Sequence, residues 1–224
     1  MRSATTLLCA ALVALSGACG APSEPPAGEA DAREPEALSR IGPGPHPIAV
    51  LDMGELGEIR VELLPEIAPE WVPFVAERAE AGTYDGTSFH RVIPGFMIQG
   101  GGAASLDHDP RNDAVNVPEP VPDHEFSDYP HTRGTVAMAN RGARKPGSVQ
   151  FFIVHEDARH LDGGYTVIGR VVEGMQVVDA ITKLEIDEYG RYGPRNRPYP
   201  VEARIQRMRI ESGGSALAGG ARNG

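Results

Sequence analysis

Hydrophobic and polar residues alternate with a period of two in several short stretches of the chain. The clearest is IRVEL at residues 59–63, which follows the apolar run IAVL at 48–51 after a turn bounded by glycines at 54–57. Such a pattern predicts a β-hairpin with one buried face. The same criteria predict eight strands, at residues 48–51, 59–63, 88–93, 96–100, 135–139, 150–154, 166–172 and 203–210.

Two further stretches have the character of helices. Residues 69–81 begin with a proline suited to a first helical turn and stop before Gly82, although Pro73 is unfavourable inside a helix. Residues 174–184 carry a stripe at helical spacing that we assign to the core: Met175, Val178, Ile181 and Leu184. Eight strands can close on themselves with side chains filling the interior. The pattern therefore predicts a mainly β fold, a closed eight-stranded antiparallel β-barrel capped by two α-helices.

The N-terminus has the three parts of a secretory signal. Arg2 is followed by an apolar stretch at 7–15 and by small residues at 16–19. The apolar stretch is too short for a permanent transmembrane helix. We therefore expect residues 1–18 to be a signal peptide.

Cys19 stands where the small residues end. The sequence SGAC that it closes is similar to the lipobox of bacterial lipoproteins, with Ser16 where that motif usually has leucine. The resemblance implies lipidation of Cys19 and attachment to the bacterial cell envelope, and Gly20 weakly favours the outer membrane because it is not the aspartate that often retains lipoproteins at the inner one. The alternative is ordinary cleavage after Ala18 or Ala21, which leaves no lipid.

Two segments outside the strands are poor in large apolar residues. Residues 19–46 are rich in Pro, Ala, Gly and Glu, and we expect them to form a flexible tether. Residues 212–224 are rich in Gly, Ala and Ser and predict a loose tail, which leaves 47–211 as the folded domain. Within it, the long proline-bearing loop at 101–134 predicts a functional segment of unassigned role.

Charge and cysteine content narrow the possible functions. The chain has 21 Lys+Arg against 31 Asp+Glu, a net charge of −10, which argues against binding to a nucleic-acid backbone. Two cysteines exclude a disulfide-rich scaffold and a four-cysteine zinc site. We interpret the acidic histidine clusters at 107–109 and 123–125 as solvated loops, and no metal or cofactor is predicted.

Three blocks of sequence hold most of the candidate chemistry. They are YDGTSFHRVIPGFMIQGG at 84–101, GTVAMAN with GSVQFFI at 134–140 and 147–153, and LDGGYTVIGRVVEGM at 161–175. In this order they closely resemble the signature blocks of the cyclophilins, except that Val149 is an added residue before Gln150. The resemblance covers nearly all of the predicted domain. It implies an eight-stranded barrel with two capping helices and peptidyl-prolyl cis–trans isomerase activity.

The physics of that reaction singles out Arg91. Rotation about a peptide bond has a barrier of ~18–20 kcal/mol because amide resonance must be broken. A catalyst needs only to bind the twisted amide better than the planar ones. The twisted nitrogen is a better hydrogen-bond acceptor, so a permanently charged donor beside it lowers the barrier. Alternation places Arg91 on one strand face with Phe89 and Ile93, and His90 and Val92 on the other.

The resemblance implies roles for the remaining site residues. Gln99 would hydrogen-bond substrate backbone and help to hold Arg91, and so is grouped with it as catalytic. The substrate-binding positions are Phe96, Met97, Ala139, Asn140, Phe152, His160, Leu161 and Tyr165. Two of them depart from common family residues, because His160 stands where tryptophan is common and Tyr165 where histidine is common. We expect activity to survive, and binding of cyclosporin to be weak.

Three functions remain open on the sequence alone. The first is a monomeric isomerase of the cell envelope, acting on proline-containing, unfolded or partly folded exported polypeptides and contacting the membrane only through its lipid. The others are a non-catalytic module that holds proline peptides, and a structural lipoprotein. Arg91 and Gln99 favour the first, because holding a peptide needs no donor aimed at the prolyl nitrogen. Phe89 and Phe151 are assigned to the core.

Overall fold

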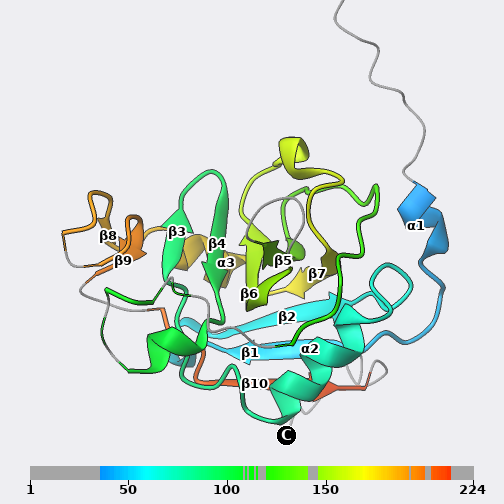
Figure 1. Cartoon of the computed structure of the whole chain (residues 1–224), viewed down its shortest axis with the longest axis horizontal. Coiled ribbons are helices and arrows are strands. Elements are labelled where there is room, and N and C mark those ends of the chain that lie inside the picture. The colour runs from blue at the N-terminus through cyan, green and yellow to red at the C-terminus, as the bar shows by residue number, and fades with distance from the viewer. Residues whose placement is uncertain are drawn as a thin grey trace, which may run out of the picture. The chain divides into compact units, whose positions relative to one another are not determined.

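A computed structural model of the chain shows a curled antiparallel β-sheet with helices packed at its margins (Figure 1). It describes residues 36–107, 109, 111–113, 115, 120–140, 146–191, 193–199 and 203–212. The sheet strands are β1 (Ile48–Asp52), β2 (Glu58–Leu63), β3 (Arg91–Ile93), β4 (Met97–Gly100), β5 (Thr135–Asn140), β6 (Pro146–Val154), β7 (Val167–Glu173) and β10 (Arg207–Glu211). They pair in the order β10-β1-β2-β7-β5-β6-β4-β3.

Each of the eight predicted strands has a counterpart in this sheet, but closure into a barrel is not confirmed. The ladder of strand pairing ends at β10 on one side and β3 on the other. Both edge strands are shorter than the predicted 88–93 and 203–210. The segments leading into them approach one another irregularly, and the Phe89 amide donates to the Ala203 carbonyl at 2.8 Å. What the structure shows is a mainly β fold with a curled eight-stranded sheet.

The β1–β2 hairpin forms as its alternating pattern predicts. Asp52 pairs with Glu58 across a turn that contains the 3-10 helix η1 (Gly54–Leu56). On β2 the alternation is complete: Ile59, Val61 and Leu63 are buried and the residues between them are not. These buried side chains belong to the main core, a cluster that also includes Phe89 and Phe151, as expected.

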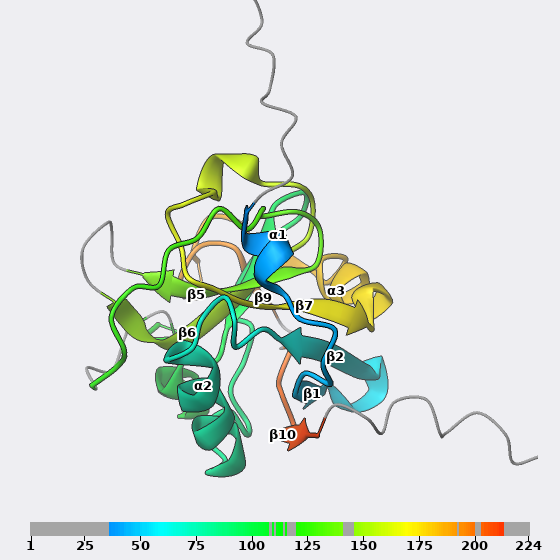
Figure 2. The same ribbon diagram turned by 90° about the vertical axis from the view of Figure 1, so that its right-hand side faces the viewer.

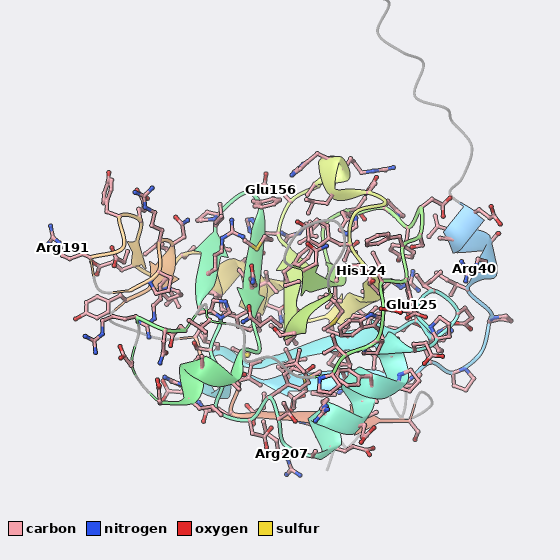
Figure 3. All side chains as sticks on the ribbon, in the orientation of Figure 1. Arg40, His124, Glu125, Glu156, Arg191 and Arg207 are labelled. Carbon is pink, nitrogen blue, oxygen red and sulfur yellow. The ribbon has the colours of Figure 1, made fainter. Side chains whose placement is uncertain are left out.

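The two predicted helices are present with shorter bounds. They are α2 (Trp71–Glu80), which packs beside β10, and α3 (Met175–Ile181). Pro73 is tolerated because it lies in the first turn of α2, where backbone N–H groups have no intrahelical partner. The carboxylate of Glu125, labelled in Figure 3, accepts hydrogen bonds from the backbone N–H groups of Glu70 and Trp71 and caps this helix. No helix in the described ranges is long and apolar enough to cross a membrane.

The folded domain begins earlier than residue 47. Helix α1 (Glu36–Arg40) packs onto it with Ala37 buried, and the Asp128 carboxylate accepts from the backbone N–H groups of Glu36 and Ala37 at 2.6 and 2.8 Å (Figure 2). Part of the predicted tether thus lies against the domain, where Ala37 is buried and Leu38 and Ile41 pack as partly buried residues on the same hydrophobic cluster. The signal peptide, Cys19 and residues 213–224 lie outside the described residues.

A second, two-stranded sheet was not predicted. It consists of β8 (Ile186–Asp187) and β9 (Arg197–Pro198) and lies beside the edge strand β3, where the Val92 amide donates to the Asn196 carbonyl at 2.7 Å (Figure 1). Arg197 forms a buried ion pair with Asp113 of the long 101–134 loop, with Nε 2.6 Å from Oδ2. The described part of that loop, which includes the 3-10 helix η2 (Ala103–Leu106), is thus tied to the β8–β9 sheet.

Candidate active site

Nine of the ten predicted catalytic and substrate-binding residues surround one cavity. Its volume is about 200 Å³. It is lined by Arg91, Phe96, Met97, Gln99, Ala139, Asn140, Phe152, Leu161 and Tyr165. These residues come from four neighbouring strands, from the turn between β3 and β4, and from the 3-10 helix η3 (Arg159–Leu161) with the segment after it. The curled sheet thus brings together blocks far apart in the sequence. The tenth, His160, lies beside the cavity.

Strand register explains how Arg91 and Gln99 share this cavity. They are directly opposite one another in the β3–β4 pair, and side chains opposite one another point to the same face. Val92 points to the other face, into the main core. Phe89 also lies in that core, so the predicted face shared by Phe89 and Arg91 is wrong. Regular strand geometry starts only at Arg91, and period-two alternation does not extend back through the irregular residues before it.

The guanidinium of Arg91 is charged and available. Its Nη1 donates to Gln99 Oε1 at 3.4 Å, a long hydrogen bond, and no carboxylate among the described residues pairs with it. Burial lowers the pKa of Arg91, and the Tyr165 hydroxyl acts in the opposite direction. A guanidinium keeps its proton throughout the physiological range. Most of its N–H donors can therefore serve a ligand in the cavity.

Gln99 is held in turn by Gln150, which the sequence analysis did not assign to the site. Gln99 Nε2 donates to Gln150 Oε1 at 3.0 Å, and Gln150 is 1% exposed. The sequence offered one indication that Gln150 belongs to the site: it lies in the second motif block, directly before Phe151 and Phe152. The added Val149 is buried and lies in an irregular part of the β5–β6 pairing. Met138 pairs with Phe151 and Asn140 pairs with Pro146, so β6 has more residues than β5 between these two pairs.

His90 contributes no second charge beside Arg91. Burial lowers its pKa to about 4, with the positive charges of Arg91 and Arg197 acting in the same direction. The ring is therefore neutral at physiological pH. Arg91 remains the cation that faces the cavity.

Aromatic rings form the apolar part of the cavity. Phe152 and Tyr165 meet edge to face, with ring centroids 5.2 Å apart. His160 stacks on Phe96 at 5.4 Å, and so contacts a cavity residue without lining the cavity itself. The result is a small apolar slot that ends at a guanidinium, a shape suited to a compact apolar ring next to a hydrogen-bond acceptor.

The backbone near Ala139 is free of the regular ladder. Strand pairing with β6 is irregular between Met138 and Asn140, and Ala139 has no register partner on either side. Such irregularities locally disrupt the ladder and are common beside binding sites. Asn140 Nδ2 donates to the Gly164 carbonyl at 2.9 Å, which ties this strand end to the segment carrying Tyr165. In the described parts of the chain, no group of three or more His, Cys, Asp or Glu could hold a metal ion.

Comparisons with known proteins agree with this geometry. The family model described as cyclophilin type peptidyl-prolyl cis-trans isomerase/CLD matches residues 48–210. A probable peptidyl-prolyl cis-trans isomerase of Brucella suis is 42% identical over 139 residues, 60% of this chain and 71% of that protein. Peptidyl-prolyl cis-trans isomerase A of Dickeya dadantii is 38% identical over 141 residues, 61% and 72% of the two chains. A Cryptosporidium parvum cyclophilin, crystallised in the presence of the dipeptide Ala-Pro, superposes with a TM-score of 0.61 at 22% identity, covering 74% of this chain and 99% of that one.

Proposed function

The chain belongs to the cyclophilin family of peptidyl-prolyl cis–trans isomerases, and we propose that it rotates Xaa-Pro bonds in the cavity beside Arg91. The apolar slot formed by Phe96, Met97, Phe152 and Leu161 receives the proline ring. The strand end at Ala139 and Asn140, which lines the same cavity, receives the backbone of the residue before proline. The occupant is a proline-containing stretch of an unfolded or partly folded polypeptide.

Arg91 supplies the preference for the twisted state. In a planar imide the prolyl nitrogen shares its lone pair with the carbonyl, and it accepts hydrogen bonds poorly. As the bond twists, the lone pair returns to the nitrogen, and the guanidinium donates to it. Because this hydrogen bond strengthens only in the transition state, it raises kcat, by about tenfold for each ~1.4 kcal/mol. No covalent bond forms, and no cofactor is used.

One observation supports this function above the others. Arg91 has no carboxylate partner among the described residues, yet it lines the same cavity as Phe96, Met97, Phe152 and Leu161. A module that only holds proline peptides would gain nothing from an unneutralised cation at this place. The catalytic function accounts for it directly.

A coupled-protease assay on an Ala-Pro peptide tests the proposal. The protease cleaves only the trans form, so the slow phase reports isomerisation. The wild-type protein should accelerate that phase, and Arg91→Ala should lose about a hundredfold or more of kcat/KM. Equal rates for the two proteins would exclude the catalytic role of Arg91.

We place the isomerase at the bacterial cell envelope, as a monomer anchored by a lipid on Cys19 after removal of residues 1–18, with the outer membrane weakly favoured. The support is the N-terminal sequence: one basic residue, a short apolar stretch and a lipobox-like end. Its clients would then be exported proteins, whose slow proline steps take tens of seconds or longer uncatalysed. Intact-mass measurement of the membrane fraction tests this, and an unmodified N-terminus would exclude the lipid.

Cyclosporin should inhibit this isomerase weakly. His160 stacks on Phe96 and offers a smaller apolar face than the tryptophan common at this position in the family. Replacing His160 by Trp should tighten inhibition about tenfold, since the larger ring buries more apolar surface. Inhibition of the wild type at low nanomolar concentration would contradict the prediction.

A further inference from the structure

Behind the cavity lies a fully buried histidine that the catalytic scheme does not use. His131 has 0% exposed surface and does not line the cavity. Its ring is nearly parallel to that of Phe152, with an interplanar angle of 18° and centroids 6.1 Å apart. It also meets the Tyr165 ring at 6.1 Å and 70°. His131 thus contacts two of the three aromatic rings that line the cavity.

The Nδ1 side of the same imidazole contacts the segment that carries Leu161. His131 Nδ1 lies 3.1 Å from Asp162 Oδ1, and the His131 backbone N–H donates to the same oxygen at 2.7 Å. An ionised carboxylate only accepts, so Nδ1 carries the hydrogen. The second oxygen of Asp162 accepts from Arg159 Nε at 2.5 Å. Asp162 directly follows Leu161, which lines the cavity.

These contacts belong to a wider attachment of one segment. The Ala158 amide donates to the His131 carbonyl at 2.7 Å, and Gly164 accepts from Asn140. Residues 158–165, which include the short turn η3 near the top of Figure 1, are therefore fixed at one end by His131 and at the other by Asn140. This segment carries His160, Leu161 and Tyr165.

We propose that His131 is a positioning residue. It holds Phe152 and Leu161, which both line the slot, at a fixed separation. The inference rests on the proposed function, because it gives that slot to the proline ring. A ring-sized site binds well only if its walls are already in place, since ordering them on binding would reduce affinity. His131 is suited to this because one face of its ring packs on Phe152 while its Nδ1–H donates to Asp162, which directly follows Leu161.

The variants separate the two contacts. His131→Phe keeps an aromatic ring against Phe152 and removes the Nδ1–H donor. Asp162→Asn keeps the size of the side chain and weakens its charge-assisted bonds. His46→Phe is the matched control, because His46 is also a buried histidine hydrogen-bonded to carboxylates, but its partners Glu62 and Glu66 are not cavity residues. All three variants can lower the melting temperature.

The readouts are the affinity for an Ala-Pro peptide by NMR titration, and kcat and KM by isomerase assay. We expect His131→Phe and Asp162→Asn to raise Kd and KM roughly three- to tenfold, the loss expected for one hydrogen bond, with kcat within twofold. The His46→Phe control should leave Kd and KM unchanged. In the wild type, the Nδ1–H resonance of His131 should shift as peptide saturates the site. Unchanged Kd and KM in His131→Phe would overturn the proposal.

Failure of the proposed function is distinguishable from failure of this inference. If the wild type binds peptide without accelerating isomerisation, the catalytic function is wrong, and the Kd of His131→Phe still decides the positioning role. If the wild type does not bind the peptide, the slot is not a proline site and both proposals are overturned.

Discussion

Two arginines on neighbouring strands have opposite surroundings. Arg91 on β3 is exposed at an apolar cavity and forms no ion pair with the described carboxylates. Arg197 on β9 is buried, and its side chain is 3% exposed against Asp113, which is 0% exposed. The cation of Arg197 is neutralised by a dedicated partner, whereas that of Arg91 is left for a ligand. Residue type alone does not separate the two roles; the presence or absence of a carboxylate does.

The comparison assigns stability to one arginine and catalysis to the other. A buried charge without its partner is strongly unfavourable, so the Asp113–Arg197 pair must stay intact for the 101–134 loop and the β8–β9 sheet to remain joined. A solvent-accessible charge at an open cavity has no such requirement. The following variants test this separation, from the largest expected effect to the smallest.

Asp113→Ala should be the most damaging change. It removes the carboxylate that neutralises the buried Arg197, and we expect a loss of about 3–5 kcal/mol in the free energy of unfolding, measured by urea denaturation. The folded fraction should keep kcat/KM within about threefold. The matched control is Asp109→Ala, which removes an exposed Asp109–Arg111 pair and should leave stability unchanged. A stable Asp113→Ala protein without activity would reverse the assignment.

Arginine-to-lysine changes sharpen the comparison, because they keep the charge and remove the planar fork. Arg91→Lys should lose about tenfold to a hundredfold of kcat/KM with unchanged stability. Arg197→Lys should lose stability and keep its activity when folded. Isomerase assays beside thermal denaturation of both variants measure this. Equal losses of kcat/KM and of stability in the two variants would show that the two sites are not functionally distinct.

Gln99→Ala tests whether the neighbours of Arg91 orient it. The Gln99 amide connects the guanidinium to buried Gln150, so its removal should lower kcat about five- to tenfold, as expected for one hydrogen bond. Gln150→Ala should have a smaller effect, and the double variant should lose less than the product of the two. If the loss of kcat in the double variant equals the product of the two single losses, Gln150 does not act on Arg91 through Gln99.

The smallest effect is a dependence of stability on pH at His46, which follows helix α1 in the chain. His46 lies between Glu62 and Glu66, with its ring nitrogens 2.9 and 3.1 Å from their carboxylates. Burial opposes the charged ring, but the hydrogen bonds and charges of the two carboxylates outweigh it and raise the pKa of His46. The charged His46 therefore stabilises the folded state by about 1 kcal/mol. This stabilisation is complete below the ordinary histidine pKa of about 6.5, and it is lost as pH rises through the raised pKa of His46.

Thermal denaturation between pH 6 and 9 checks this prediction. The wild-type melting temperature should fall by a few degrees relative to His46→Gln as pH rises, since about 1 kcal/mol corresponds to that shift. Kinetics at the cavity should not change with this substitution. Parallel melting curves for the two proteins across the range would contradict the charged state of His46.

Sequence reasoning located the cavity because its key residues are local. Arg91 and Gln99 belong to one hairpin, so a single motif fixes both their identity and their register. The other lining residues were predicted from the resemblance of the three blocks to the cyclophilin signature and not from alternation, because β5 and the described part of β6 are buried at nearly every position. The slot could therefore be predicted only as far as the motif blocks match the family.

The contacts that the sequence did not reveal join distant segments. Asp113 and Arg197 are 84 residues apart, and neither has a local pattern that points to the other. The docking of α1 depends on Asp128, 91 residues from Ala37, and overrides a composition typical of a tether. Irregular backbone at the edges of the sheet has no sequence period either, which is why the closed barrel was predicted and not confirmed.

The central claim is that the Arg91 guanidinium, which has no carboxylate partner in the part of the chain that the structure describes, favours the twisted imide. Exchange NMR on an Ala-Pro peptide, with catalytic amounts of protein, measures cis–trans interconversion and binding in one sample. The wild type should produce exchange on a timescale of seconds or less, where the free peptide needs tens of seconds or longer. Arg91→Ala should still bind the peptide yet lose that exchange. Exchange at the wild-type rate in Arg91→Ala would contradict the claim.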